Sequence, residues 1–222
     1  MWEIIRNTMP FLWEGLINTT WLSICAIVFG SSLGFIVGLC RAIGPVWLKK
    51  IFGGYIHLLR GSPFLVQIYI IYFVLPSTGI AIFQLSSWSA AIISLRIYTS
   101  TYVAEIVRGA IEAIPAGQFE AAKASGMTVF QSMRYVILPQ TIGMILPPMG
   151  GIYVIVIKST SVLSVIAVSE LVRQAETSIL RYPSHILLIY GLVAFMYGIY
   201  CYPVLRLTRW AENRWGGIHV AS

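Results

Sequence analysis

The sequence predicts an all-α fold, a polytopic membrane bundle of about five transmembrane helices. Hydrophobic residues make up 58% and charged residues only 10% of the 222 residues, whereas about a quarter of the residues in a soluble domain are charged. Several apolar runs approach the roughly twenty residues that a helix needs to cross the hydrocarbon layer. Helices are expected there because they satisfy their backbone hydrogen bonds internally, as lipid requires.

The first apolar run, Leu16 to Leu39, contains no charged residue and predicts the first membrane helix. The residues before it lack the basic start and the small-residue cleavage site of a signal peptide, so we expect this helix to be retained. Gly30, Gly34 and Gly38 are spaced by four residues. Such spacing allows a neighbouring helix to approach closely, and glycines that simply face lipid are the alternative.

The next two helices are predicted from about Pro63 to Leu75 and from about Trp88 to Ile111. The first of these could begin earlier, because residues 53–59 are also apolar apart from a histidine. The second carries Arg96 and Glu105. Its length fits one crossing with a cytoplasmic extension.

Residues 108–139 form the most polar segment and predict a soluble hairpin of two short helices within a single domain, residues 1–222. Pro115 suits a first helical turn, and Gly126 suits a left-handed helix end. Thr128 and Gln131 have the spacing of a capping box at the start of the second helix.

The fourth apolar run, Ile142 to Ile157, contains Pro147 and Pro148 and two glycines. We expect a broken helix here, because proline removes amide donors inside the membrane. The fifth helix is predicted from about Ile186 to Leu207. The mixed sequence of residues 158–183 between them suggests a surface or partly embedded helix.

The charge pattern predicts the orientation. The net charge of +7 would suggest nucleic-acid binding in a soluble protein, but basic residues also collect in cytoplasmic loops of membrane proteins, so we expect no nucleic-acid partner. With five crossings the termini lie on opposite sides. Ten of the fifteen Lys and Arg residues fall on the side of the hairpin, which places the N-terminus outside and the hairpin and C-terminus in the cytoplasm. The three cysteines form no spaced pair, which indicates neither a disulfide framework nor a metal site.

The hairpin carries a motif. Glu120, Ala121 and Ala122 are followed after three residues by Gly126, and after nine more by residues 136–139, Val-Ile-Leu-Pro. This resembles the EAA loop of the permease subunits of ABC importers, Glu-Ala-Ala, three residues, Gly, nine residues, Ile-x-Leu-Pro. Only the valine departs from that pattern.

Three further segments resemble the polar amino acid branch of these permeases, which includes the histidine and glutamine systems. They are Arg-Gly-Ser-Pro-Phe-Leu-Val-Gln at 60–67, Tyr-Val-Ala-Glu-Ile-Val-Arg-Gly at 102–109, and Lys-Ser-Thr-Ser at 158–161 followed by Val165 and Ile166. The resemblance covers roughly residues 15 to 210 and implies the type I importer fold.

The resemblance implies a function and partners. The chain would be a permease subunit that carries a polar L-amino acid across the bacterial inner membrane by alternating access, not an enzyme. It would pair with a copy of itself or a paralogous permease, with two ATPase subunits and with an external solute-binding protein. The chain has no phosphate-binding loop of the usual type, so ATP and Mg would bind the partner ATPase, and no cofactor is expected on this chain.

The hairpin would offer an apolar helix face to a groove on the ATPase. The family assigns this contact to the positions of Glu120 and Gly126. The residues that we assign to ATPase coupling are Glu120, Ala121, Ala122, Gly126, Phe119 and Phe130, with Met127 and Met133 as further apolar contacts.

Charges within the membrane suggest the translocation pathway. An intramembrane Arg is costly, by roughly 3 kcal/mol on insertion scales, so Arg96 is expected to face the bundle interior; it is either a snorkelling or packing residue or a ligand for a substrate carboxylate. Lys158 is either an interfacial anchor or a second ligand. The pathway residues that we assign are Arg96, Ser100, Tyr72, Lys158, Ser159 and Thr160, and Glu105 and Arg108 form a structural or gating ion pair at i, i+3.

The sequence departs from the family pattern at two places. Where the family often has Asn-Glu, this chain has Gly151 and Ile152, and where the family often has Asp after the lysine, this chain has Ser159. Fewer carboxylates favour an anionic or neutral polar amino acid over a cationic one. Alternatives are an ion-coupled secondary transporter, a permease for another small polar solute, and a membrane scaffold that recruits an ATPase. No internal repeat supports the first of these.

Overall fold

The computed structural model describes residues 1–215. These residues form ten α-helices, connected by short 3-10 and π-helical turns, and no β-strand. Four helical segments are long and apolar enough to cross a membrane, and a bent helix pair can supply a fifth crossing. The expected all-α bundle of about five membrane helices is therefore confirmed.

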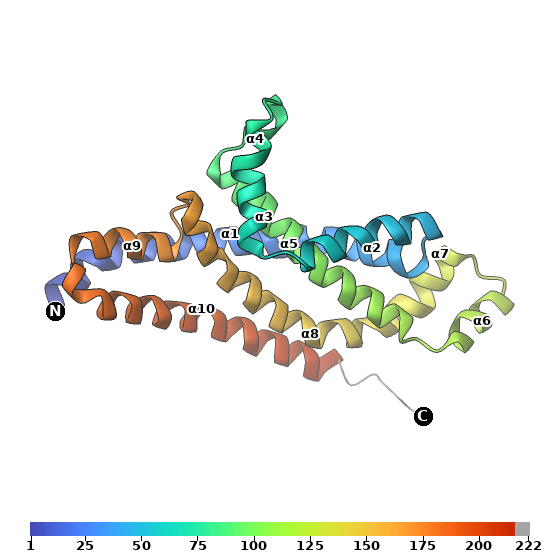
Figure 1. The fold of residues 1–222 in the computed structure, drawn as a ribbon. Coiled ribbons are helices and arrows are strands. Elements are labelled where there is room, and N and C mark those ends of the chain that lie inside the picture. Colours follow the sequence, from blue (N-terminus) through green and yellow to red (C-terminus); the bar gives the residue numbers. More distant parts are fainter. Residues whose placement is uncertain (216–222) are drawn as a thin grey trace.

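Helix α1 (Trp2–Ile43) is a single helix of 42 residues, about 63 Å long at 1.5 Å per residue. It begins well before the predicted Leu16, because Leu12 and its neighbours are buried against α9 (Leu171–Arg181) and α10 (Ile186–Trp215). The start of α1 lies beside α9 at one end of the bundle (Figure 1).

Helix α5 (Ser87–Glu112) differs from its predicted bounds by one residue at each end. It runs parallel to α1 and packs along it, with Gly30, Gly34 and Gly38 at the contact. Of the two alternatives for these glycines, the close approach of a neighbouring helix is therefore the observed one. The start of α5 lies on the side of the bundle where α1 begins.

Residues 46–60, of which 53–59 were considered as an earlier start of the second membrane helix, form the helix α2 (Val46–Arg60). It packs against α1 and α5 through Ile56. The sequence pattern missed the first half of α2 because lysines interrupt its apolar run.

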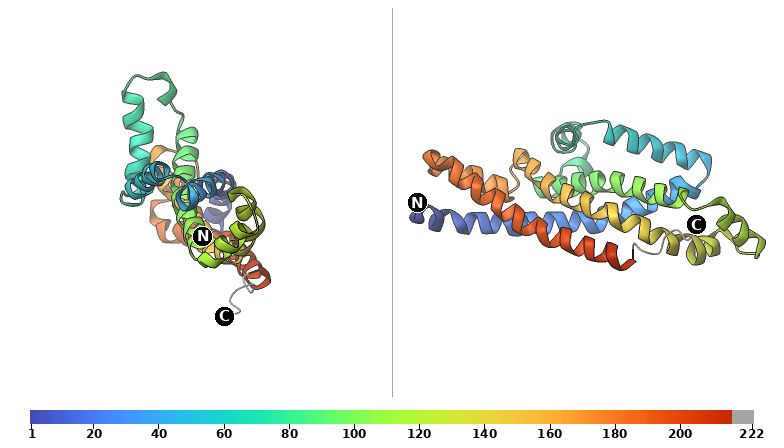
Figure 2. Two further views of the ribbon diagram at one scale, coloured as in Figure 1. Left: turned by 90° about the vertical axis from the view of Figure 1, so that its right-hand side faces the viewer. Right: turned by 90° about the horizontal axis from the view of Figure 1, so that it is seen from below.

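The predicted second membrane helix is bent away from α2 by 106°. It consists of α3 (Phe64–Tyr69), a π-helical turn and α4 (Leu75–Ser77). The bend occurs at Gly61–Pro63, where proline disfavours a helical conformation of the preceding residue. Together with the turn that follows, these elements form an arm, residues 64–83, that projects from the bundle (Figures 1 and 2).

The predicted hairpin is present as α6 (Ala116–Ala124) and α7 (Val129–Ser132). Pro115 is the residue that precedes α6, one position before the first helical turn in which it was expected. A π-helical turn, Met133–Ile137, joins α7 directly to α8 (Leu138–Ser159).

Helix α8 is continuous, so the prediction of a broken fourth helix is wrong. Pro147 and Pro148 lie inside it and remove two amide donors. The remaining hydrogen bonds and the packing of α8 against α5 and α10 hold the helix together.

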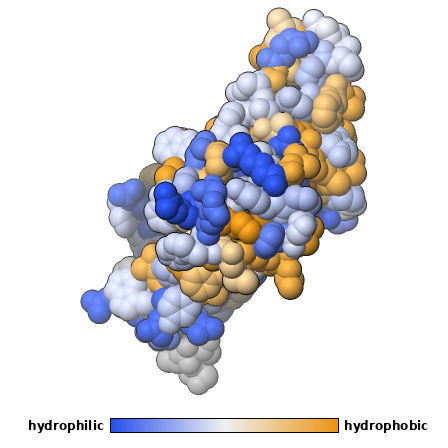
Figure 3. Space-filling view, turned by 90° about the vertical axis from the view of Figure 1, so that its left-hand side faces the viewer, coloured by the Kyte–Doolittle hydropathy of each residue, from blue (hydrophilic) through white to orange (hydrophobic). Residues whose placement is uncertain are grey.

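Between α8 and α10 the chain forms a 3-10 helix, Thr160–Ile166, a left-handed residue, Ala167, and α9. Helix α10 starts at the predicted Ile186 and continues past the predicted end. Hydrophilic residues gather over the end of the bundle where α1 begins, while hydrophobic residues line the side of the arm (Figure 3). This distribution is typical of a membrane protein viewed along its long axis.

Candidate coupling and translocation sites

The turn of the hairpin is fixed by local hydrogen bonds. Gly126 has φ 76°, and the amides of Gly126 and Met127 donate to the carbonyls of Lys123 and Ala122 at 3.0 and 3.1 Å. This pair of bonds is the Schellman arrangement, which closes a helix through a left-handed residue. The predicted left-handed conformation of Gly126 is confirmed.

The second hairpin helix is capped as predicted. The hydroxyl of Thr128 accepts from the Gln131 amide at 3.3 Å, and the Gln131 side chain accepts from the Thr128 amide at 2.8 Å. A capping box satisfies two amides that the helix start leaves free. The two short helices are therefore held at a defined angle by residues of the hairpin itself.

The apolar residues of the hairpin divide between two faces. Phe130 is 72% and Val129 69% exposed. Phe119 and Met133, by contrast, pack into the chain's own core with Ile137. The outward face therefore consists of Phe130 and Val129, a residue that the sequence analysis missed.

A groove of about 450 Å³ runs between the end of α1 and the hairpin. Its lining includes Ile43, Phe119, Lys123, Met127 and Val129. Helices that dock a partner commonly do so through an apolar groove beside an exposed anchor. The predicted contact Met127 lies in this groove.

The motif residues Glu120, Ala121 and Ala122 also face different ways. Glu120 and Ala121 are exposed, whereas Ala122 is buried. In the described part of the chain the Glu120 carboxylate has no hydrogen bond or ion pair. An exposed, unpaired carboxylate next to an apolar face is available for a partner.

The hairpin is connected firmly to the membrane helices. The Gln140 side chain donates to Gln118 at 3.3 Å and to the Val136 carbonyl at 2.8 Å, which ties α6 to the start of α8. Ile137 is fully buried with residues of α5. A displacement of the hairpin would therefore be passed to α8 and α5.

Glu105 joins the ends of α1 and α5. It forms ion pairs with Arg108 at 2.8 Å and with Arg41, and Arg108 also pairs with Glu112. The expected i, i+3 pair of Glu105 and Arg108 is present, and Arg41 is a partner that the sequence analysis missed. Its structural or gating role stays a prediction.

Arg96 is half-buried, with its guanidinium carbon 5.0 Å from the centre of the Phe29 ring of α1. Phe29 itself is 50% exposed. A cation over an aromatic face is stabilised by about 0.5–2 kcal/mol. Arg96 therefore lies at the contact between α1 and α5, partly exposed, and not in the centre of the bundle.

Lys158 lies on an exposed stripe of α8 with Pro148, Gly151 and Ile155. A Cβ atom at Gly151 would meet no other atom within 4 Å. The hydroxyl of the next residue, Ser159, donates to the Ile155 carbonyl at 2.9 Å and lies near the Tyr98 hydroxyl of α5. This stripe combines open space, a cation and hydroxyl groups.

Tyr98 belongs to a row of aromatic residues that the sequence analysis missed. Its ring lies 4.5 Å from Phe64 and 5.0 Å from Tyr102, and the Tyr102 hydroxyl donates to the Tyr98 hydroxyl at 3.3 Å. Arg60 lies over the Tyr102 ring. Tyrosines at i, i+4 could have indicated such a row, but aromatic residues in an apolar helix more often belong to the core.

The other expected pathway residues lie apart from this stripe. Ser100 is buried and within 2.6 Å of the Tyr55 hydroxyl. Thr160 is buried and within 3.4 Å of the Tyr197 hydroxyl, and Tyr72 packs in the core beside α5. The structure therefore brings Ser159 close to Tyr98, but it does not bring together the six residues that we had assigned to one pathway.

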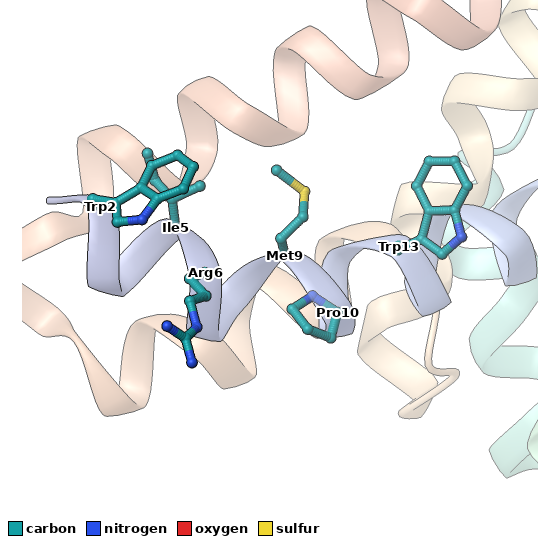
Figure 4. A pocket seen from close by; sticks show the side chains of 6 residues that line it. All are labelled: Trp2, Ile5, Arg6, Met9, Pro10 and Trp13. Carbon is teal, nitrogen blue, oxygen red and sulfur yellow. The ribbon is translucent and has the colours of Figure 1, made fainter.

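A further groove of about 540 Å³ lies along the first turns of α1. It is lined by Trp2, Ile5, Arg6, Met9, Pro10 and Trp13, all from one helix (Figure 4). Trp2 and Trp13 mark its two ends, and tryptophan is enriched where a membrane helix meets water. It offers no cluster of polar groups for a ligand. No group of three or more His, Cys, Asp or Glu residues that could hold a metal lies within residues 1–215.

Comparison with known proteins decides the family. A family model described as "Binding-protein-dependent transport system inner membrane component" matches residues 30–216. The chain belongs to this family. As a member, it is a multi-pass membrane protein and a transport component.

Two relatives of this inner membrane component match nearly its whole length. The L-cystine transport system permease protein TcyB of Bacillus subtilis (strain 168) is 34% identical over 214 residues, which are 96% of this chain and 90% of TcyB. The glutamine transport system permease protein GlnP of Escherichia coli (strain K12) is 34% identical over 213 residues, which are 96% of both.

Solved structures agree with this family. A chain in the crystal structure of an amino acid ABC transporter with histidines matches the inner membrane component with a TM-score of 0.84 and 33% identity, covering 95% of this chain and 96% of that chain. The MetNI methionine ABC transporter in inward-facing conformations matches with a TM-score of 0.70 at 19% identity, which supports the fold alone.

Proposed function

We propose that this chain is the permease subunit of an ATP-binding-cassette importer that moves a polar L-amino acid across the bacterial inner membrane. The observation that carries the proposal is the hairpin, which is rigid, joined to α5 and α8, and exposes Phe130, Val129 and the unpaired Glu120. The two relatives above, which are named as amino-acid permeases, support the class of substrate.

The partners follow from this assignment. Two ATPase subunits, which carry ATP and Mg, receive the hairpins of two permeases, and an external solute-binding protein delivers the amino acid. The second permease is a copy of this chain or a paralogue. The arm supports such a pairing because it projects from the bundle and exposes apolar side chains, among them Phe73 and Val74.

Substrate passes along the exposed stripe of α8, where Lys158 offers a cation for the substrate carboxylate and Ser159 with Tyr98 offers hydroxyl groups. The stripe is open because Gly151 leaves space beside the helix. A Lys within a membrane segment faces a partner or a water-filled cavity, since exposure to lipid is costly.

Reconstitution in lipid vesicles tests the proposal. Vesicles that contain the chain and its ATPase, with the binding protein on the other side of the membrane, should take up a labelled polar amino acid. They should do so only when ATP is present on the side of the ATPase. Uptake that an ion gradient drives without ATP would identify a secondary transporter. ATP-driven uptake of another polar solute, with no amino acid taken up, would retain the importer and reject the substrate class.

A further inference from the structure

A polar cavity lies between α1, α2 and α5. It has a volume of about 570 Å³, within the usual range of roughly 300–1,000 Å³ for small-molecule sites. Seven residues line it: Arg41, Ile56, His57, Arg60, Gly61, Glu105 and Arg108. The cavity is located near the end of α1 and within two turns of the end of α5, on the side of the hairpin (Figure 2).

A row of polar and aromatic side chains connects this cavity with the C-terminal end of α8. Ser159 of α8 lies near the Tyr98 hydroxyl, and the Tyr102 hydroxyl donates to the Tyr98 hydroxyl at 3.3 Å. The guanidinium carbon of Arg60, a cavity residue, lies 5.0 Å from the centre of the Tyr102 ring. On α5, Tyr98, Tyr102 and Glu105 are spaced as i, i+4 and i+7, which places them on one face of the helix. The row therefore leads from the end of the α8 stripe to the cavity.

Arg60 is the arginine of the cavity that has no anionic partner. Arg41 and Arg108 are both paired with Glu105, and Arg108 also with Glu112. In the described residues Arg60 forms no ion pair, and its side chain is exposed. Each guanidinium has five N–H donors, so donors remain for an anion.

The cavity also contains an acceptor for a cation. The side chain of Glu105 is 22% exposed, so a small ligand can reach it. Its carboxylate pairs with Arg41 and Arg108, but an ionised carboxylate has about four acceptor sites. A free guanidinium and a reachable carboxylate in one cavity fit a ligand that carries one carboxylate and one ammonium group. Every α-amino acid carries this pair at neutral pH.

We propose that this cavity is an exit site, which binds the zwitterionic head of the transported amino acid through Arg60 and Glu105 before its release on the side of the hairpin. The row of Tyr98 and Tyr102 guides the amino acid to it from the α8 stripe. The site contacts the part of the substrate that all α-amino acids share, so it does not select among side chains. This inference rests on the proposed function.

Protection of a cysteine at the cavity tests the proposal. His57→Cys places a thiol at an exposed position of the cavity lining, in a Cys40→Ala background where Cys25 and Cys201 are buried. In the solubilised complex of the full-length chain with its ATPase, L-glutamine should slow the modification of this thiol by a maleimide. L-Glutaminol, which has an alcohol in place of the carboxylate, should not. Glutamine serves as the probe because the proposed contacts involve only the shared head.

Arg60→Gln in the same background should raise the glutamine concentration that gives half-protection about tenfold or more, as loss of a hydrogen-bonded charge does. Arg60→Lys should recover part of the affinity, because it restores the charge without the two-pronged contact. Lys50→Gln is the matched control. It removes an exposed charge of α2 about 15 Å along the helix from Arg60, where salt screens it, and should change half-protection less than about twofold.

Four results would overturn the proposal: no protection by glutamine, equal protection by glutaminol, equal protection by inorganic phosphate, which would indicate a site for free anions, or unchanged half-protection in Arg60→Gln. The first three need no variant at Arg60, so they hold even if Arg60→Gln does not fold. ATP-driven uptake, measured separately on the wild-type complex, distinguishes the two proposals. Uptake without protection would reject the exit site alone. Protection in a complex that takes up no amino acid would reject both the proposed function and the exit role.

Discussion

Gly34 of α1 lies so close to Val103 of α5 that a Cβ atom on the glycine would come within 2.6 Å of the valine Cβ. Gly30 and Gly38, one turn before and after, make the same kind of approach to α5. At these three positions α1 has no side chain, so its backbone lies directly against side chains and carbonyl groups of α5. Small residues at four-residue spacing allow this contact within a membrane.

Gly34→Ala is expected to destabilise the protein. The added methyl group would also stand 2.7 Å from the Ser100 carbonyl, and overpacking of this kind typically costs about 1–3 kcal/mol. Gly198→Ala on α10 is the matched control, because a Cβ there meets no atom within 4 Å. Thermal unfolding in detergent should show a lower midpoint for Gly34→Ala only. Equal midpoints for both variants would contradict the close contact.

Gly126→Val should abolish ATP-driven uptake while the protein still inserts in the membrane. A β-branched residue resists the left-handed conformation, φ 76°, that the hairpin turn requires. Gly117→Val is the control, since Gly117 lies in the same hairpin within α6 and has open space around it. Uptake and substrate-stimulated ATPase activity measure the result. Normal values for both in Gly126→Val would refute the role of the turn.

The orientation can be tested with cysteine labelling. Helices α1 and α5 run parallel. The segment that leads into α5, which includes Ser77 at the end of α4, should therefore lie on the side of the N-terminus, and Gly117 on the other. In a Cys40→Ala background, where Cys25 and Cys201 are buried, an impermeant thiol reagent should label Ser77→Cys in intact cells. Gly117→Cys should react only after permeabilisation. The reverse pattern would place the N-terminus in the cytoplasm.

Local signals predicted the hairpin well. Gly126 and the pair Thr128–Gln131 act through hydrogen bonds over three to five residues, so their spacing alone determines the turn and the cap. The glycine spacing of α1 predicted a neighbour but not its identity. The neighbour is α5, and this pairing depends on how the whole bundle is arranged. A local sequence pattern does not carry that information.

Features that depend on tertiary surroundings were missed. The continuity of α8 through Pro147 depends on helices packed around it. The bend before α3 depends on the packing of the helices on either side of it. The separate positions of Ser100 and Tyr72 depend on how each helix is rotated about its axis, which hydrophobicity alone does not indicate. Phe119 has the apolar character of a docking residue, yet it packs partly against the chain's own core and only partly lines the groove beside α1.

Glu170 belongs to the segment that the sequence analysis predicted as a surface or partly embedded helix, and its side chain is 0% exposed. It caps α9 by accepting from the amides of Val172 and Arg173 at 2.9 and 2.7 Å. Burial raises the pKa of Glu170 from 4.5 to about 7, although these hydrogen bonds oppose the shift. The folded protein therefore binds a proton more tightly here than the unfolded chain.

The sign of the effect follows from linkage. The contribution of Glu170 to stability is complete below about pH 4.5 and is lost as pH rises through about 7. Glu170→Gln should thus match the wild-type unfolding midpoint near pH 5 and exceed it near pH 8, by an upper bound of roughly 3 kcal/mol. Glu3→Gln, at the exposed N-terminus, controls for the loss of one charge. Parallel curves for wild type and Glu170→Gln would contradict the shift.

Arg96 is expected to contribute to substrate recognition through its charge. No carboxylate pairs with it in the described residues, and each amino acid substrate carries one that could. Arg96→Gln should lower the maximal uptake rate about tenfold or more, as loss of a hydrogen-bonded charge does, with unchanged affinity of the external binding protein. Arg96→Lys should recover only part of the rate, because an ammonium group cannot form the two-pronged contact of a guanidinium.

Phe29→Leu separates this role from packing. It removes the aromatic ring beneath Arg96 but keeps the charge and an apolar side chain. If the charge acts on substrate, Phe29→Leu should transport near the wild-type rate at equal membrane abundance, while Arg96→Gln does not. If both variants are equally slow, the contact with α1 is what matters. If Arg96→Gln transports normally, the residue is structural, and Lys158→Gln, on the exposed stripe of α8, should then show the loss.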